Sequence, residues 1–139
     1  MRVEIRLLDN GLGILYTIVG QAGQAAWAQA IVRRHIRSAR YVIVDFTDAD
    51  LSELGDSDVK GIVQGDRELA SLNQDLVQAI VAPGDLSYGI GRMYASRIDG
   101  GAWPTQVFRV RDEAEAWLRT QLDEALTFTA GPQLVERSP

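Results

Sequence analysis

The chain has 139 residues, of which 46% are hydrophobic and 24% are charged, and this excludes collagen-like repeats, long disordered tracts and multidomain enzymes. The absence of cysteine excludes a disulfide framework, a thiolate nucleophile and Cys-based zinc or iron–sulfur sites. Fourteen basic residues against nineteen acidic ones give a net charge of -5, which opposes the phosphate-tracking surface of a nucleic-acid-binding protein.

No run of the sequence approaches the roughly 20 apolar residues of a membrane span. The first ten residues alternate charged and apolar side chains, unlike the apolar core of a signal peptide. We therefore expect a cytoplasmic protein with no membrane span, no nucleic-acid partner and no cofactor.

The beginning of the chain predicts an antiparallel hairpin. Residues 2–8 alternate strictly between apolar and charged, which is the period of a strand buried on one side. Asp9-Asn10-Gly11 has the composition of a tight turn, and residues 12–19 are rich in β-branched and aromatic side chains. We expect the first strand to be an edge of the sheet, where it could pair with a second copy in a closed homodimer.

Helical and strand patterns then alternate along the chain. Residues 22–38 predict a helix with His35 near the middle of its apolar face. The apolar run 41–46 predicts a central strand covered on both faces, and residues 47–56 predict an acidic loop. The later patterns predict helices over 57–73, over about a dozen residues from Asp85 and from Asp112 to about Leu126, with strands at 76–82 and 105–110.

The last two helices carry more specific signals. The sequence Pro83-Gly84-Asp85 predicts a turn that caps the first of them. Asp112 and Glu115 have the spacing of a capping box for the second. The inward face predicted for the helix from Asp85 consists of Leu86, Gly89, Ile90 and Met93.

The order of these elements is ββαβαβαβα. It predicts one α/β domain over residues 1–128, with a mixed five-stranded sheet and about four helices, in which the hairpin joins a parallel core through right-handed crossovers. Residues 129–139 show no hydrophobic period, and we expect them to form a flexible tail.

Acidic residues gather between the central strand and the second helix, with no lysine or arginine from position 41 to 59. An EF-hand loop from Asp48 would need glycine sixth and glutamate twelfth, where the chain has Glu53 and Val59, so we expect no metal site. A phosphoacceptor like that of response-regulator receivers would use Asp45, and a solvated loop whose Asp56 or Ser57 caps the next helix is the alternative. The acidic residues are Asp45, Asp48, Asp50, Glu53, Asp56 and Asp58.

Two polar residues fall on apolar helix faces. Asp66 lies near the centre of the apolar arc of the second helix, and His35 lies within that of the first. A buried carboxylate is costly unless it is paired, so we expect a buried Asp66 with a charged partner. The candidate partners are His35, Arg92 and Arg97. The catalytic alternative is an acid/base pair formed by Asp66 and His35.

Familiar catalytic and phosphate-binding motifs are missing from the sequence. It contains no G-x-S-x-G elbow, no G-x-G-x-x-G turn and no G-x-x-x-x-G-K-[ST] loop. The pair Gly89 and Gly91 lies inside a predicted helix, where it indicates close packing. We expect no enzymatic activity.

Three features lie in order between Tyr41 and Met93. They are a hydrophobic strand ending in Asp (VIVDF), an Asp-Ser pair that opens a helix (LGDSDVKGIV), and a strand running into a loop and helix (AIVAPGDLSYGIGRMY). This stretch resembles the STAS domain of anti-sigma factor antagonists and their SpoIIAA-like relatives, and the element order agrees over nearly the whole chain. The resemblance implies a SpoIIAA-like fold and a regulatory role in protein binding.

The same resemblance points to the start of the second helix. Regulatory members of the family carry an Asp-Ser-Ser-Gly stretch there, with a serine that a partner kinase phosphorylates. This chain has Asp58 and Val59 in place of the second serine and the glycine, so Ser57 is the remaining candidate phosphoacceptor. Asp58 is either a fixed mimic of phosphoserine or an ordinary acid at a helix start.

Two functions follow as hypotheses. The first is a non-enzymatic STAS-like regulatory module in the cytoplasm that binds a protein with a basic face. The second is a domain that binds a small ligand or anion at the helix N-termini of Ser57 and Asp85, since ligands bind at the carboxyl ends of parallel strands. The expected partner- or anion-binding residues are Asp45, Asp56, Ser57, Asp58, Asp85 and Ser87.

Overall fold

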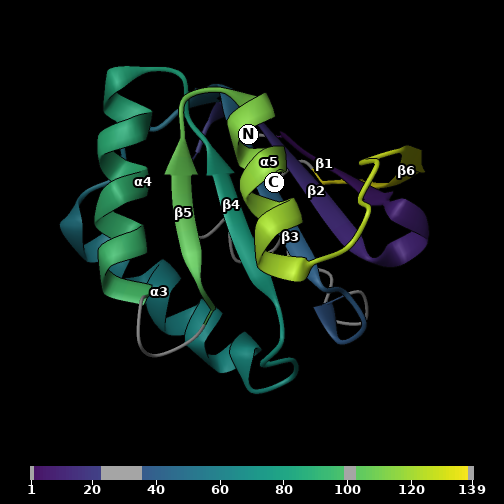
Figure 1. Cartoon of the computed structure of the whole chain (residues 1–139). Helices are drawn as coiled ribbons and strands as arrows, with labels where there is room; N and C mark the ends of the chain where they lie inside the picture. The colour runs from purple at the N-terminus through teal and green to yellow at the C-terminus, as the bar shows by residue number, and fades with distance from the viewer. Residues whose placement is uncertain (1, 23–35, 99–102, 138–139) are drawn as a thin grey trace.

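A computed structural model describes residues 2–22, 36–98 and 103–137 (Figure 1). Most of the predicted first helix, including His35, and the predicted turn at 99–101 lie outside these residues. The described strands form one mixed sheet in the order β5-β4-β3-β2-β1-β6. The elements are β1 (Arg2–Leu8), η1 (Asp9–Gly11), β2 (Gly13–Gln21), β3 (Tyr41–Asp50), α3 (Asp56–Ala70), β4 (Val77–Val81), α4 (Asp85–Ile98), β5 (Thr105–Phe108), α5 (Arg111–Leu122) and β6 (Ala130–Arg137).

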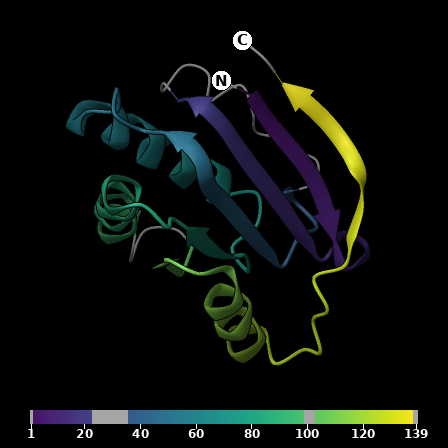
Figure 2. The same ribbon diagram turned by 90° about the horizontal axis from the view of Figure 1, so that it is seen from above.

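The described helices cover the two faces of this sheet. Helices α3 and α4 lie on one face and α5 lies on the other (Figure 2). Strand β3 is buried on both sides, as its continuous apolar sequence predicts. Val42 and Val44 pack into the core on the α3/α4 side, and Tyr41 and Ile43 pack into the core on the α5 side.

The predicted hairpin is confirmed. Strands β1 and β2 pair antiparallel from Arg2 opposite Val19 to Leu8 opposite Gly13. The 3-10 turn between them contains Asp9 and Asn10, both at positive φ. The parallel core is also confirmed, because β2, β3, β4 and β5 pair parallel in turn.

The expected acidic loop at 47–56 is partly wrong. Strand β3 continues to Asp50, because β2 is long enough to pair with it as far as Gln21 opposite Asp50. Along residues 45–50 only Phe46 is buried, and the strand is mostly exposed from Thr47 to Asp50. The true loop is therefore the short segment 51–55.

The segment expected to be a flexible tail contains a sixth strand instead. Strand β6 pairs antiparallel with β1, with register shifts on either side of Arg6. Gly131 and Pro132 interrupt any alternation in its sequence, which is why a sequence pattern does not show it. Strand β1 consequently lies between β2 and β6 and is not an edge, so a homodimer through a free β1 edge loses its basis.

The helical phase predicted for α4 is partly wrong: Ile90 and Met93 pack against the core as predicted, but Leu86 and Gly89 do not. Leu86 is 55% exposed, and Gly89 has no atom within 4 Å of an added Cβ. Gly91 lets α4 approach β5 so closely that an added Cβ would be 3.1 Å from Val107 Cγ1. The buried residues of α4 are Ser87, Gly91, Tyr94 and Ile98.

Helix α5 is shorter than predicted and begins differently. It ends at Leu122, followed by Asp123 in the left-handed conformation. Val110 is its N-cap, so there is no side-chain cap from Asp112. Glu115 instead accepts a hydrogen bond from Arg111 at 2.9 Å, one turn earlier on the same helix.

Candidate functional site

The first predicted site lies at the start of α3, and its acidic side chains form ion pairs and hydrogen bonds with other residues of the chain. Asp56 pairs with Arg97 of α4 and with Lys60 at 3.2 Å. These hydrogen bonds, that of Arg97 first, hold the pKa of the exposed Asp56 carboxyl below its ordinary value. Asp58 accepts a hydrogen bond of 2.8 Å from the Gly55 backbone. Asp58 therefore acts as the third-residue partner of a capping arrangement at this helix start.

Ser57 lies between these two acids and is exposed. Across the described parts of the chain, its hydroxyl makes no hydrogen bond, whereas both flanking carboxylates are held. A serine in this state, on the first turn of a helix, is accessible to a modifying enzyme. The structure thus places Ser57, the candidate serine phosphoacceptor, on the surface.

The second predicted site, at the start of α4, is also internally bonded. Asp85 accepts a hydrogen bond of 2.8 Å from Arg109. Ser87 is buried, and its hydroxyl donates to the Gly84 carbonyl at 3.1 Å. The Arg109 guanidinium also lies 4.2 Å from the centre of the Tyr88 ring, a distance typical of a cation–π contact.

The structure does not bring the two helix starts into one site. Asp56 contacts Arg97, which belongs to the last turn of α4, whereas Asp85 begins that helix. A helix of 14 residues is about 20 Å long at 1.5 Å per residue. Ser57 and Asp85 therefore face different ends of α4.

Asp45, the candidate phosphoacceptor by comparison with response-regulator receivers, is hydrogen-bonded to a neighbour on the same strand. Its Oδ1 accepts hydrogen bonds from the Thr47 backbone at 2.9 Å and from the Thr47 hydroxyl at 2.6 Å. Nearby, Asp50 caps the Ser52 backbone at 2.9 Å, and hydrogen bonds from the Ser52 side chain and backbone lower the Asp50 pKa. Among the described residues, no group of three acidic or histidine side chains is arranged to hold a metal ion.

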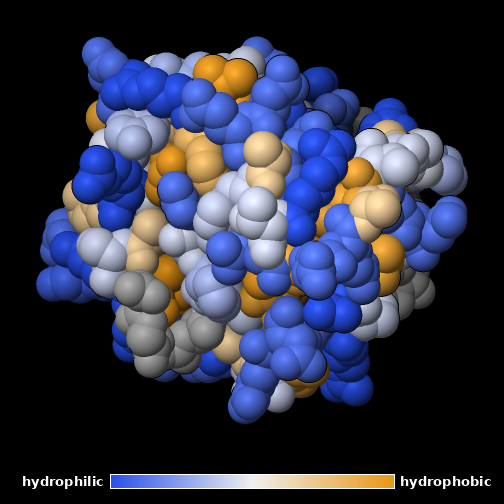
Figure 3. Space-filling model, in the orientation of Figure 1, coloured by the Kyte–Doolittle hydropathy of each residue, from blue (hydrophilic) through white to orange (hydrophobic). Residues whose placement is uncertain are grey.

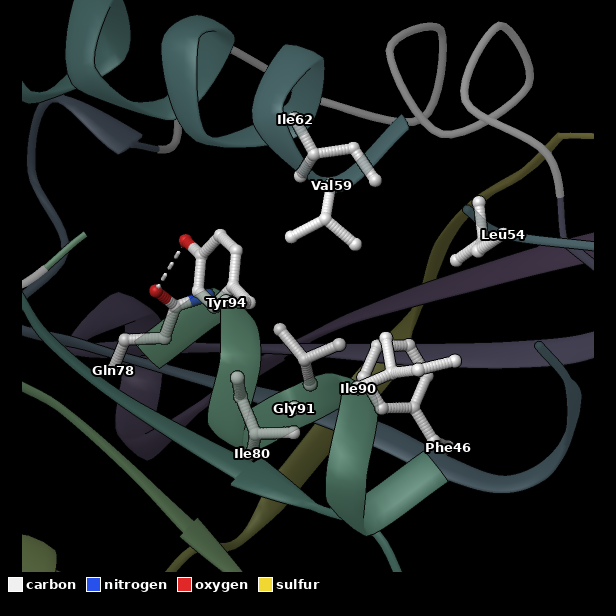
Figure 4. Close-up of a pocket in the computed structure, with 10 residues that line it drawn as sticks. Phe46, Leu54, Val59, Ile62, Gln78, Ile80, Ile90, Gly91 and Tyr94 are labelled. Carbon is white, nitrogen blue, oxygen red and sulfur yellow. Dashed lines mark hydrogen bonds between the residues drawn. The ribbon is translucent and has the colours of Figure 1, made fainter. Parts of the chain in front are cut away.

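Asp66 is buried on α3, as its place on the apolar arc predicts, and is only 5% exposed. Among the described residues its partner is Tyr94, and neither Arg92 nor Arg97 contacts it. Asp66 Oδ2 is 2.5 Å from the Tyr94 hydroxyl. The same hydroxyl is 3.0 Å from Gln78 Oε1, the contact marked by the dashed line in Figure 4. Thr105 extends the chain of contacts, since its hydroxyl donates to Gln78 at 3.3 Å. Of the predicted partners, Arg97 bonds Asp56, Arg92 lies near Tyr88, and His35 is outside the described residues.

The environment of Asp66 favours its protonated form. Burial raises the Asp66 pKa to about 6, against the opposing effect of the hydrogen bond with Tyr94. One phenol carries a single hydrogen. Tyr94 donates to Asp66 Oδ2 when the carboxyl is ionised. When Asp66 is protonated, its hydroxyl donates to Tyr94 and frees the phenol hydrogen for Gln78 Oε1. The same burial raises the Tyr94 pKa well above its ordinary value, so the phenol stays neutral.

A small apolar cavity lies beside this buried network. Figure 4 shows apolar side chains of α3, α4, β3 and β4 around it, with Tyr94 and Gln78 at one side. Its volume is about 30 Å³, which is room for roughly one water molecule and far below the roughly 300–1,000 Å³ of ligand pockets. The network is therefore sealed from substrates.

A larger hollow, which sequence reasoning missed, follows β5. It holds about 550 Å³ between α4 and α5, with β5 as its floor. Strands β3, β4 and β5 follow one another in the sheet, because α3 and α4 cross the same face in the same direction. The repeated strand–helix order of the sequence could therefore have predicted that β5 lies at an edge of the sheet. The lining side chains include Tyr88, Arg92, Ala95 and Ser96 of α4, Thr105 and Val107 of β5, and Trp117 of α5.

With this geometry established, the chain was compared with known proteins. No protein-family model matches it, and the curated proteins give no significant match. Of the helices in the described ranges, none is long and apolar enough to cross a membrane. The geometry is that of an α/β domain with a mixed six-stranded sheet, and any narrower assignment is a proposal.

Proposed function

We propose that this protein is a non-enzymatic STAS-like regulatory module that binds another protein in the cytoplasm. The observation that carries the proposal is the exposed Ser57 on the first turn of α3, between two carboxylates that are already bonded. It occupies the helix start at which the resemblance to STAS domains implies a phosphoacceptor. Asp58 then serves as a helix-capping acid, which favours this role over that of a phosphoserine mimic.

We propose no enzymatic activity, because the acidic side chains at the predicted sites are already hydrogen-bonded within the fold or are buried. Asp56, Asp58 and Asp85 are each held by hydrogen bonds within the fold. Asp66 has the raised pKa of a functional acid, but it is buried, and the cavity beside its partner Tyr94 has room for only about one water molecule. A general acid must reach the proton it transfers, and Asp66 reaches only Tyr94.

Phosphorylation of Ser57 would change the charge of this helix start by about -1.5 to -2 at neutral pH. The new phosphate would lie next in sequence to Asp56, which pairs with Arg97 and Lys60. The phosphate competes with Asp56 for Arg97, and Arg97 belongs to α4. A modification of α3 thereby alters the contact between the two helices.

The test is a quantitative recovery of partners with the tagged full-length chain in its native cells. We expect a protein partner whose recovery changes severalfold between wild type and Ser57→Glu. Ser38→Glu is the matched control, because Ser38 is also exposed but precedes β3 at the opposite end of that strand. Equal recovery with all three chains, or no partner above the background of an unrelated tagged protein, would overturn the proposal.

A further inference from the structure

We propose that the groove along the free edge of β5 binds an extended, acidic segment of a partner protein as an added β-strand. This inference rests on the proposed function as a protein-binding module and names the chemistry of its partner. Figure 3 shows the groove face, where apolar surface lies between α4 and α5 among hydrophilic side chains. The occupant follows from three features: the unpaired edge, the shape of the groove and its charge.

The first feature is the hydrogen-bonding capacity of the edge. Among the described strands, β5 pairs with β4 alone. The carbonyls of Pro104 and Phe108 accept hydrogen bonds from that side, from Gln78 and from Ala82. Alternate residues of a strand direct their backbone groups to opposite sides, so those of Thr105 point to the free edge.

Val107 follows Thr105 by two positions and has the same orientation. Within the described ranges, neither residue has a backbone hydrogen bond to another loop or helix. An extended peptide can therefore continue the ladder with donors and acceptors of both residues. This is the recognition mode in which main-chain hydrogen bonds supply affinity and side-chain pockets supply specificity.

The second feature is the shape of the groove. Helices α4 and α5 flank the free edge on the two faces of the sheet, and side chains of α4 and β5, with Trp117 of α5, line an open hollow of about 550 Å³ along it. This volume is within the range of ligand sites, roughly 300–1,000 Å³. Strand β5 has four residues, about 13 Å at 3.3 Å per residue, so the groove admits a segment of similar length. Trp117 of α5 and Ala95 of α4 offer apolar surface to its alternate side chains.

The third feature is the charge. Arg92 is exposed on α4 and lines the groove. Its guanidinium carbon is 6.0 Å from the centre of the Tyr88 ring, and it has no ion pair with any described residue. A second cation, Arg109, covers the same ring at 4.2 Å and shares its charge with Asp85. A free guanidinium at the wall of a strand-sized groove complements a carboxylate of the incoming segment.

The chain's own C-terminal strand is excluded as the occupant, because β6 pairs with β1 at the opposite edge of the sheet. A second copy that pairs through its own β5 would bring the same Arg92 wall to both sides of the interface. Like charges on both sides of a contact disfavour it. A foreign acidic strand meets neither obstacle.

The probe is a fluorescein-labelled peptide of eight residues in which valine alternates with glutamate, titrated into the purified full-length protein and followed by anisotropy. Its counterpart alternates valine with lysine. We expect the glutamate peptide to bind at least tenfold more tightly than the lysine peptide, with binding that weakens as salt is added. With Arg92→Glu, the order of the two peptides should reverse. Arg37→Glu, at another exposed arginine, should leave the order unchanged.

Two further measurements test whether the peptide binds at the free edge of β5. Methylation of alternate backbone nitrogens on one side of the glutamate peptide should abolish binding, whereas methylation on the other side should not. On binding, the Thr105 and Val107 amides should become protected from hydrogen exchange. Equal affinity of both peptides, insensitivity to methylation, or occupation of the edge by a second copy in sedimentation experiments would each overturn the inference.

The failure of this inference is distinguishable from that of the proposed function. A partner whose recovery depends on Ser57, together with a glutamate peptide that does not bind, removes only the β5 site. A peptide that binds at β5, without any partner that responds to Ser57→Glu, removes the regulatory role and leaves the docking edge.

Discussion

The hydroxyl of Tyr94 and the carboxyl of Asp66 lie 2.5 Å apart in the core between α3 and α4. This contact joins two helices through groups that are both buried, with Asp66 5% and Tyr94 7% exposed. The strength of this contact depends on the protonation state of Asp66. Because the Asp66 pKa is about 6, that state changes close to neutral pH.

The first prediction concerns the pH dependence of stability. Unfolding returns the Asp66 pKa from about 6 to its ordinary value of 3.8, so the folded state holds the proton more firmly. The contribution to stability is complete below about pH 4 and is lost as the pH rises through 6. Two pKa units at about 1.36 kcal/mol each amount to about 3 kcal/mol. Asp66→Asn should therefore unfold at higher denaturant concentration than wild type at pH 8, and the difference should shrink toward pH 4.

Urea melts of both proteins from pH 4 to pH 8 check this expectation. The comparison at each pH isolates Asp66, because the other carboxylates titrate in both chains. Parallel stability curves, with no convergence at low pH, would contradict a protonated Asp66 in the core.

The second prediction concerns the phenol itself. Tyr94→Phe keeps the ring and removes the hydroxyl that lies between Asp66 and Gln78. Leaving buried polar groups without partners costs about 1–3 kcal/mol, and we expect a loss of that size at pH 7 in a urea melt. Tyr88→Phe is the matched control, since Tyr88 is only partly buried, and it should change stability by less than about 0.5 kcal/mol. Similar losses in both variants would show that the phenol hydrogen bonds of Tyr94 contribute little.

The third prediction uses two glycines of the same helix. Gly91→Ala would place a Cβ 3.1 Å from Val107 Cγ1, and overpacking of this kind costs about 1–3 kcal/mol. Gly89→Ala meets nothing within 4 Å and should stabilise the helix by up to about 1 kcal/mol. Thermal melts of the two variants should shift in opposite directions. A stabilised Gly91→Ala would mean that α4 does not approach β5 as closely as the structure shows.

The fourth prediction concerns the attachment of the C-terminal segment. Asp9 accepts hydrogen bonds from the Tyr41 hydroxyl at 2.6 Å, from the Thr127 hydroxyl at 2.7 Å and from the Phe128 backbone at 3.1 Å. Burial acts to raise the Asp9 pKa, but these hydrogen bonds together lower it. Their stabilisation is present above the ordinary pKa of 3.8 and is lost as the pH falls through the folded value.

Asp9→Asn tests this attachment, because asparagine tolerates the positive φ of 50° at this position but lacks the charge. We expect a loss of about 2 kcal/mol at pH 7 and faster hydrogen exchange of β6 than of β3. Asp75→Asn, at an exposed loop position, should change neither. Unaltered exchange of β6 in Asp9→Asn would show that other contacts hold the strand.

The sequence was informative wherever one period dominated. Strict alternation predicted β1, and the burial of Asp66 followed from its place on the apolar arc of α3. The partner of Asp66 could not be predicted, because α4 carries apolar residues around much of its circumference. Close contact with β5 selects the face of Ser87 and Gly91, and this rotation turns Tyr94 toward Asp66.

The sixth strand and the β5 groove escaped prediction for different reasons. Strand β6 gains its register from pairing with β1, including the hydrogen bond from Arg6 to the Gly131 carbonyl, and its own sequence contains no strand period. The groove is a property of the strand order and of two helices on opposite faces. The acids that the sequence emphasised are mostly engaged in local capping and ion pairs.

The pairing of β6 with β1 also sets the order of events during synthesis. Arg6 and Gly131 are 125 positions apart, and at 5–20 residues per second the ribosome needs roughly 6–25 s to make the chain between them. Throughout that interval the outer edge of β1 is without its partner. A newly made chain thus exposes a strand edge that the finished protein covers, and a nascent-chain chaperone or a neighbouring polysome product has that long to bind it.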